Sequence, residues 1–171
     1  QQQWISSLSQ SLLLGHAAGV GAALYVHIPF CQSLCTYCGC NTRITRNKEV
    51  GQPYVATLLK EFDLYLSALS QTEWGDRKIP ITEIHLGGGT PTFLSPDSLE
   101  ALIQGILSRG VVTADSEFSA EADPRVTHRE HLAVLARNGF RRLSLGIQDF
   151  DPKVQETVHR IQSEAQVREV T

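Results

Sequence analysis

The N-terminal quarter of the sequence is marked by missing charge. The first 42 of the 171 residues contain no Lys, Arg, Asp or Glu, and the whole chain contains no Met. A secretory signal needs a basic segment before its apolar run, and none precedes Leu12 to Leu14. Gly15, Gly19 and Gly21 interrupt the uncharged stretch, which argues against a membrane span of about 20 apolar residues. We therefore expect a cytoplasmic protein without a transmembrane helix.

Charge balance and missing motifs exclude further classes. The net charge of −3 gives no excess of basic groups for nucleic acid or for an anionic membrane surface. No P-loop or dinucleotide fingerprint is present, so we expect no phosphate cradle. There is also no internal repeat and no low-complexity segment. Because 42% of the residues are hydrophobic, a chain of this length can bury one core, and we expect a monomer.

The four cysteines all lie between residues 31 and 40. Cys31, Cys35 and Cys38 form a C-x3-C-x2-C pattern directly after an apolar run. A four-iron cluster usually takes four thiolates, so three would leave one iron open, as catalytic metal sites do. Zinc closed by Cys40 is the second interpretation, although zinc ribbons usually use two separated C-x2-C pairs. Disulfides are the third, and they suit small secreted domains.

Strand and helix signals alternate along the rest of the chain. Alternating or β-branched apolar runs predict strands at residues 24–28, 79–86, 117–122 and 143–147. Helical spacing and caps predict helices at residues 54–69, 97–109, 127–138 and 153–160, and residues 1–14 are compatible with another. Ser95 and Thr127 are the expected N-caps, and Asn138-Gly139 the expected stop. Four strand–helix units with short connections predict a parallel α/β sheet, open or closing into a barrel.

Polar motifs fall at the predicted carboxyl ends of these strands. The cysteines follow the first strand, Gly87 to Gly89 the second, and Gln148 the fourth, while Glu121 lies in the third. Ligands of parallel α/β sheets bind at that edge, so one shared site is expected. Each residue taken alone also has an ordinary structural interpretation. The glycines suit a tight turn, Glu121 a surface ion pair, and Arg160 a helix C-terminus.

Taken together, the motifs resemble the radical S-adenosylmethionine enzymes and, within them, the oxygen-independent coproporphyrinogen III oxidases. The resemblance runs from about Leu24 to Gln162 and is carried by residues 25–31, 35–41, 85–92, 121–124 and 145–150. The cysteine triplet marks the superfamily. The continuation Cys38-Gly39-Cys40-Asn41 favours the oxidases over their close relatives.

The resemblance implies a fold, cofactors and a reaction. The fold would be a partial parallel (β/α) barrel, in which Cys31, Cys35 and Cys38 ligate a 4Fe-4S cluster whose open iron binds S-adenosylmethionine. A 5′-deoxyadenosyl radical would take hydrogen from the propionates of coproporphyrinogen III. Loss of CO2 would then leave vinyl groups and give protoporphyrinogen IX in haem biosynthesis. An electron donor and an electron acceptor, neither identified by the sequence, would be needed.

The resemblance also implies cofactor contacts at single positions. Tyr25, Gly88 and Glu121 match contacts to the cluster-bound S-adenosylmethionine. A second S-adenosylmethionine would be contacted by Tyr37, Gly89, Thr90, Gln148 and Arg160. An arginine suits this role because its planar fork pairs with a carboxylate through two hydrogen bonds.

Two domains of unequal size are expected. Residues 1–21 would be an N-terminal extension, and residues 22–171 the N-terminal portion of the barrel. About four of roughly six barrel units are present. Because Met is absent and the sequence ends in a helix-like run, we expect part of a longer protein that is inactive alone. The alternatives are a haem-trafficking relative that binds the cluster without decarboxylation, and a structural zinc module.

Overall fold

The computed structural model describes residues 2–171. Its helices are α1 (Gln2–Ala17), α2 (Gly51–Leu69), α3 (Pro96–Arg109), α4 (Arg129–Arg137), α5 (Pro152–Thr157) and α6 (Glu164–Glu169). Its strands are β1 (Ala22–Ile28), β2 (Phe30–Cys31), β3 (Arg43–Ile44), β4 (Ile79–Gly88), β5 (Gly110–Ala122) and β6 (Phe140–Leu145). Short 3-10 turns occupy Lys48–Val50 and Pro91–Phe93.

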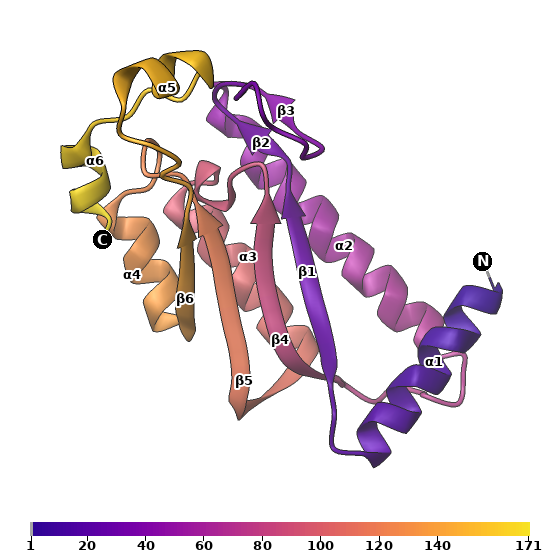
Figure 1. The fold of residues 1–171 in the computed structure, drawn as a ribbon. Helices are drawn as coiled ribbons and strands as arrows, with labels where there is room; N and C mark the ends of the chain where they lie inside the picture. Colours follow the sequence, from indigo (N-terminus) through magenta and orange to yellow (C-terminus); the bar gives the residue numbers. More distant parts are fainter. Residues whose placement is uncertain (1) are drawn as a thin grey trace.

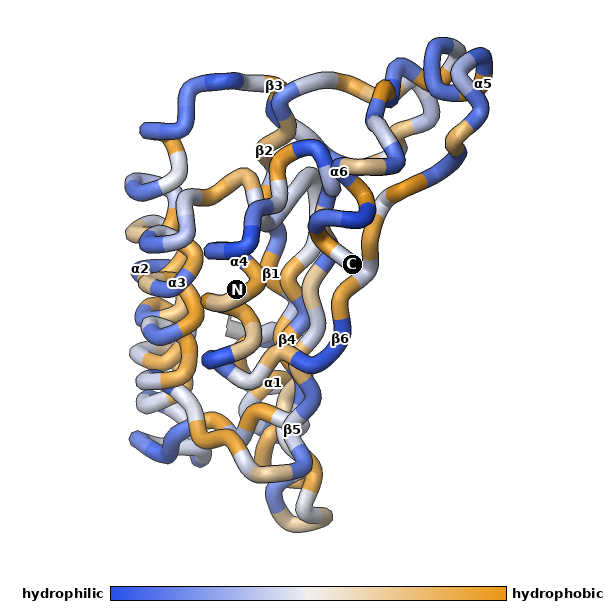
Figure 2. Tube along the Cα trace, turned by 90° about the vertical axis from the view of Figure 1, so that its left-hand side faces the viewer, coloured by the Kyte–Doolittle hydropathy of each residue, from blue (hydrophilic) through white to orange (hydrophobic). Residues whose placement is uncertain are grey.

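The main sheet has the order β1-β4-β5-β6, and every neighbouring pair is parallel. Helices α2, α3 and α4 follow β1, β4 and β5 in the chain and cover one face of this sheet (Figure 1). Figure 2 views the molecule from the side, with α2 and α3 along one face of the sheet. The predicted alternation of parallel strands and helices is therefore confirmed, and the sheet is part of a (β/α) barrel. Among the elements of residues 2–171, none forms a helix layer on its other face (Figure 1).

Alternation along each strand separates the two faces. In β4, Ile84 and Leu86 are buried against the helices, whereas Glu83 and His85 point to the open face. Leu99 and Leu102 of α3 are fully buried in the same core. A second core joins α1 to the amino end of the sheet through Leu12, Leu69, Trp74 and Ile79. The helix-covered face is thus an ordinary apolar core.

Several predicted boundaries are confirmed by their caps. The Ser95 hydroxyl accepts a hydrogen bond from the Ser98 N–H at 3.2 Å, with Pro96 at the first helical position of α3. Helix α4 ends at Arg137 with Asn138 as its C-cap, and Gly139 follows with φ of 88°.

The N-cap predicted for α4 is wrong by one residue. His128 is the cap, and its backbone N–H donates to His131 Nδ1 at 3.1 Å. The Thr127 hydroxyl instead donates to the Asp123 carbonyl at 2.8 Å and lies 2.9 Å from the Thr92 hydroxyl. Thr127 is therefore committed to the loop after β5 and not to the helix.

The last two predicted elements are also shifted. Strand β6 begins at Phe140, where that ring packs against Phe118 of β5 with centroids 5.4 Å apart, and it ends before Ile147. Helix α5 ends at Thr157, and His159 follows with φ of 52°. A left-handed residue cannot continue a helix. Arg160 therefore lies beyond the helix and not at its C-terminus.

The two-residue pairing of β2 with β3 was not predicted, and it lies above the carboxyl end of β1 (Figure 1). Within residues 2–171, no helix has the length and apolarity needed to cross a lipid bilayer.

Candidate metal and cofactor site

A cavity of about 330 Å³ lies at the carboxyl edge of the sheet. Its walls come from the loops after β1, β4, β5 and β6, as the motif positions predicted. All the predicted site residues except Tyr25 line it, namely Cys31, Cys35, Tyr37, Cys38, Gly88, Gly89, Thr90, Glu121, Gln148 and Arg160. The structure thus brings the predicted constellation into one place.

The cysteines enter this cavity from a single loop as four free thiols, so none forms a disulfide. Cys35 is buried, Cys31 and Cys38 are half-buried, and Cys40 is exposed. Cys31 Sγ lies 3.5 Å from the Thr90 hydroxyl. Burial raises the pKa of the Cys31 thiol, and the hydrogen bond with Thr90 opposes that rise. The three triplet cysteines therefore occupy different environments.

The closed zinc site is not assembled. Zinc binds sulfur at about 2.3 Å, so its ligands must converge on one point. Among residues 2–171, no group of three or more His, Cys, Asp or Glu side chains is placed to hold a metal ion in this way. A four-iron cluster does not require that convergence, because each thiolate binds a different iron. Three thiols lining one cavity fit such a cluster.

The glycine run shapes the floor of the cavity. Gly88 has φ of 110°, a conformation that a residue with a side chain rarely adopts. A Cβ on Gly89 would lie 2.9 Å from Cys31 Sγ and 2.9 Å from the Phe30 carbonyl oxygen. The backbone after β4 therefore approaches the cysteine loop as closely as glycine alone permits. This close approach leaves room for a bound group beside the thiols.

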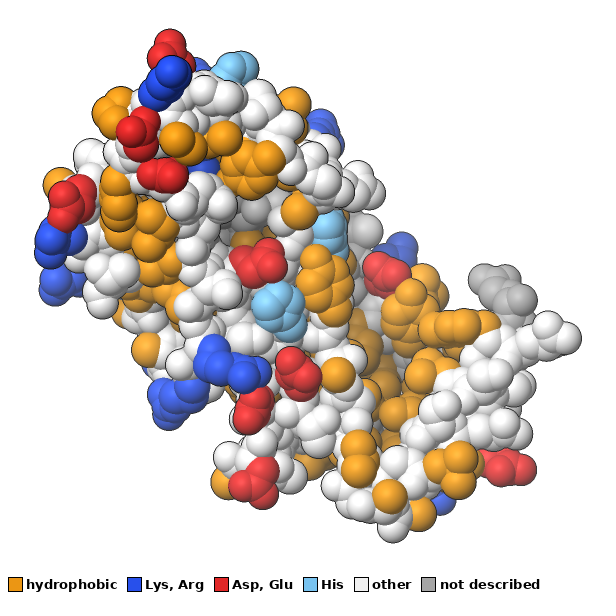
Figure 3. Space-filling view, in the orientation of Figure 1, with side chains coloured by type: hydrophobic (Ala, Val, Ile, Leu, Met, Phe, Trp, Pro, Cys, Tyr) orange, Lys and Arg blue, Asp and Glu red, His pale blue; other side chains and the backbone are white. Residues whose placement is uncertain are grey.

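Glu121 lies where β5 meets this floor. Its Oε2 accepts a hydrogen bond from the Gly88 N–H at 3.2 Å, and its Oε1 lies 3.6 Å from His85 Nε2. His85 is held on its other side by the Ser119 hydroxyl, 2.8 Å from Nδ1. Figure 3 views this open face, with acidic and histidine side chains at its centre. Glu121 is therefore an oriented acceptor, and its backbone and histidine contacts differ from those of a simple surface ion pair.

Tyr25 lies outside the cavity but beside Glu121 on the open face. Its ring stacks on His85 with centroids 5.8 Å apart, and its hydroxyl lies 3.0 Å from His27 Nδ1. The residue is 60% exposed, so it is not a core residue. Burial raises the pKa of the Tyr25 phenol, and the charges of Glu121 and Cys40 add to the rise. Tyr25 is thus available to a ligand on this face.

Tyr37 and Gln148 both line the cavity. Burial raises the pKa of Tyr37, while the nearby charge of Arg160 opposes the rise. Gln148 adopts φ of 68°, which is uncommon for a residue other than glycine and turns the chain directly after β6.

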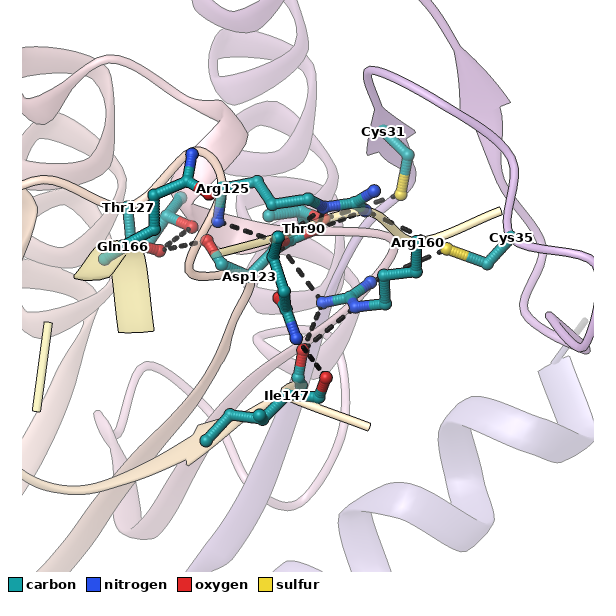
Figure 4. Close-up of polar contacts among 12 residues, drawn as sticks. Cys31, Cys35, Thr90, Asp123, Arg125, Thr127, Ile147, Arg160 and Gln166 are labelled. Carbon is teal, nitrogen blue, oxygen red and sulfur yellow. Dashed lines mark hydrogen bonds and ion pairs between the residues drawn. The ribbon is translucent and has the colours of Figure 1, made fainter. Parts of the chain in front are cut away.

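Arg160 belongs to a buried charged cluster (Figure 4). Its Nε donates to the Gly146 carbonyl at 2.9 Å, its Nη2 lies 3.2 Å from Asp123 Oδ1, and its Nη1 lies 3.6 Å from Cys35 Sγ. Arg125 shares the same carboxylate, with Nη2 2.6 Å from Asp123 Oδ2. The interpretation of Arg160 as a helix-end cation is therefore wrong.

Sequence reasoning missed Asp123 and Arg125 as site residues. A signal was present, because both follow β5 directly at the sheet edge where the other motifs lie. His27 Nε2 lies 2.8 Å from the Asn41 carbonyl oxygen, which ties β1 to the end of the cysteine loop.

The family model of the Radical SAM superfamily matches residues 25–171, and the chain belongs to this superfamily. Its similar curated relatives are oxygen-independent coproporphyrinogen III oxidases. That of Pseudomonas aeruginosa is 39% identical over 155 residues, which is 90% of this chain and 32% of the relative. That of Bradyrhizobium diazoefficiens is 36% identical over 161 residues, which is 94% of this chain and 33% of the relative.

A solved structure is also similar. Coproporphyrinogen III oxidase from Escherichia coli, described as a radical SAM enzyme, superposes with a TM-score of 0.75 at 36% identity. The match covers 85% of this chain and 32% of that one. The chain thus spans about a third of the length of the relatives it matches.

Proposed function

We propose that this chain contributes the cluster and cofactor site of an oxygen-independent coproporphyrinogen III oxidase. The reaction would convert propionate side chains of coproporphyrinogen III to vinyl groups, with loss of CO2, giving protoporphyrinogen IX. The observation that carries the proposal is the single cavity in which three thiols meet Gly88, Glu121 and the other matched positions. The similarity to the oxidases supplies the substrate.

Cys31, Cys35 and Cys38 would hold a 4Fe-4S cluster, and Cys40 would not be a ligand. When bound, the cluster and S-adenosylmethionine supply hydrogen-atom abstraction, a reaction beyond any side chain of the protein. The chain itself would supply the three thiolate ligands and fix their positions. It also keeps part of the site away from water, since Cys35 is buried.

The carboxylate and backbone groups beside the cysteines would orient the cofactor. Glu121 is held by Gly88 and His85, so its free acceptor capacity can receive hydrogen bonds from an amino group or a ribose hydroxyl. Tyr25, on β1, would contact the same S-adenosylmethionine molecule as Glu121. A second S-adenosylmethionine would lie against Tyr37, Gly89, Thr90, Gln148 and Arg160.

The open face of the sheet would form the inner wall of the barrel, where the porphyrinogen is bound. Residues 22–171 would supply the first part of that barrel, with residues 1–21 as an extension. The complete reaction would require the rest of the barrel, an electron donor and an electron acceptor. We expect this chain alone to bind the cluster without turning over substrate, and to be a monomer.

The test is anaerobic reconstitution of the protein with iron and sulfide, followed by metal analysis and spectra before and after S-adenosylmethionine. About four irons per chain and a cluster signal changed by S-adenosylmethionine are expected. Cys31→Ser, Cys35→Ser and Cys38→Ser should each lose most of the iron, whereas Cys40→Ser, the matched control, should retain it. Tightly bound zinc without a response to S-adenosylmethionine would sink the proposal.

A further inference from the structure

Two guanidinium groups converge on one cysteine of the triplet. Arg160 Nη1 lies 3.6 Å from Cys35 Sγ, and Arg125 Nη2 lies 3.8 Å from the same atom (Figure 4). Both are donor–sulfur contacts of N–H groups that always carry positive charge. Arg125 also reaches the Ser33 hydroxyl at 3.3 Å, so it contacts the cysteine loop at two positions.

This cluster is buried and its charges do not balance. Asp123, Arg160 and Cys35 are 7%, 8% and 9% exposed. Among the described residues, Asp123 is the carboxylate that pairs with these two arginines. One negative and two positive charges leave one excess positive charge, and an unpaired buried charge is costly. A thiolate at Cys35, the form in which cysteine ligates an iron–sulfur cluster, would supply a compensating negative charge.

Within residues 2–171, the other two cysteines of the triplet have no contact with an arginine or lysine. Cys31 meets a neutral hydroxyl, that of Thr90. Cys38 has Cys40 as a neighbouring thiol, and their mutual contact raises the pKa of Cys40 after the larger effect of burial. Positive donors are therefore concentrated on one sulfur of the three.

The two arginines differ in the other contacts that they make. Arg160 already has a proposed cofactor contact and a backbone bond to Gly146. Arg125 has neither, and its Nε and Nη2 both contact the Asp123 carboxylate, at 3.0 Å and 2.6 Å. The guanidinium is thus fixed and charged beside the sulfur.

We propose that Arg125 is a positioning residue for the cluster, which fixes Cys35 and raises the cluster's reduction potential. The inference rests on the proposed function. The cluster accepts one electron from an external donor, and no bond to the protein forms or breaks in that step. Added negative charge is stabilised by a nearby cation and by hydrogen bonds to a ligand sulfur, both of which tune such potentials. Removing Arg125 should therefore make reduction harder.

The experiment is a dithionite titration of the reconstituted full chain, monitored by the electron paramagnetic resonance of the reduced cluster. Arg125→Gln should make reduction at least tenfold less favourable, a fall of 59 mV or more for a one-electron couple. Arg125→Lys keeps the charge and loses the fork, so it should fall by less. Asp123→Asn removes a negative charge and should move the potential upward.

Arg137→Gln is the matched control, since Arg137 pairs with Glu100 between α3 and α4, away from the cysteines. It should leave the potential unchanged. Iron content and circular dichroism are measured on every variant, so that a folding defect is recognised.

The outcomes separate the two proposals. Wild-type protein that takes up no cluster would overturn the proposed function and this inference with it. A wild-type cluster together with an unchanged potential in Arg125→Gln overturns the inference alone. If Arg125→Gln cannot hold the cluster, Arg125→Lys decides, and a lowered potential there supports the inference. An unchanged potential in Arg125→Lys, or loss of the cluster from both variants, makes the role purely structural and overturns it.

Discussion

The two faces of the β1-β4-β5-β6 sheet are built from alternate residues of the same strands and have opposite characters. Toward the helices, β4 and β5 present Ile84, Leu86 and Phe118, all buried. Toward the open side the same strands present His85 and Glu121, which contact each other. One face is an apolar core, and the other is a polar surface leading to the cysteine cavity.

Stability and binding chemistry therefore depend on different residues of the same strands. Apolar burial stabilises the fold by about 25 cal/mol for each Å² removed from water. The buried apolar area of the sheet is on the helix-covered face, so this stabilisation comes from residues on that face. Polar groups on the open face cost little stability, because solvent or hydrogen bonds satisfy them. Substitutions on the covered face should therefore lower the free energy of unfolding. Substitutions on the open face should instead weaken cluster or cofactor binding.

The largest expected effect is at the floor of the cavity, where the open face meets the cysteine loop. Gly89→Ala places a Cβ 2.9 Å from Cys31 Sγ and from the Phe30 carbonyl, and a backbone atom cannot yield cheaply. We expect loss of most cluster iron on reconstitution. Gly39→Ala, in the cysteine loop itself, is the control, since a Cβ there meets nothing within 4 Å. Equal iron content in the two variants would contradict the close-approach argument.

The next largest effect is expected on the covered face, where a truncated side chain lowers the free energy of unfolding. Leu86→Ala removes a fully buried side chain and should cost about 2–5 kcal/mol in the free energy of unfolding. Glu83→Ala, on the open face of the same strand, should change that free energy by about 0.5 kcal/mol or less. Urea denaturation measures both. Similar losses for the two would mean that the faces are not distinct.

A smaller effect is expected on the open face, at Tyr25. Tyr25→Phe removes the hydroxyl that lies 3.0 Å from His27 Nδ1. One lost hydrogen bond corresponds to about 1 kcal/mol, or roughly a fivefold weaker affinity for S-adenosylmethionine if Tyr25 contacts it. Isothermal titration calorimetry on the reconstituted protein measures this affinity. Unchanged affinity would remove Tyr25 from the proposed contacts.

The smallest effect is a pH dependence within the helix layer. His131 is buried, and burial lowers its pKa below the ordinary value of 6.5. As pH falls below about 6.5, the unfolded chain binds a proton that the folded protein resists, so stability decreases toward the folded pKa. We expect weaker resistance to urea at pH 5.5 than at pH 7.5. His131→Gln should flatten this difference, and an equally steep dependence in the variant would argue against it.

Local signals predicted most of the fold and most of the residues that the structure brings together in the candidate site. Ser95-Pro96 set the start of α3 because its cap depends on adjacent residues only. The cysteines, the glycine run and Glu121 were predicted to meet because the carboxyl ends of parallel strands share one edge. These are consequences of short-range chemistry combined with topology.

Long-range contacts explain what was not predicted. Thr127 resembles a cap, but it bonds across the loop to Thr92, a partner that local sequence cannot indicate. The pairing of Arg125 and Arg160 on Asp123 joins residues from two separate loops. The start of β6 depends on Phe118, which lies one unit earlier in the chain.

The small pairing of β2 with β3 has a consequence for the unloaded site. Backbone bonds from Arg43 N–H to the Pro29 carbonyl (2.6 Å) and from Thr45 N–H to the Cys31 carbonyl (2.9 Å) tie together the two ends of the cysteine loop. Closing a loop of about a dozen residues costs roughly 2 kcal/mol of chain entropy. The protein closes this loop before any metal binds. The cysteine thiols therefore sample a smaller volume when iron and sulfide bind. Cluster uptake should thus proceed as docking into a prepared loop, without folding the loop around the metal.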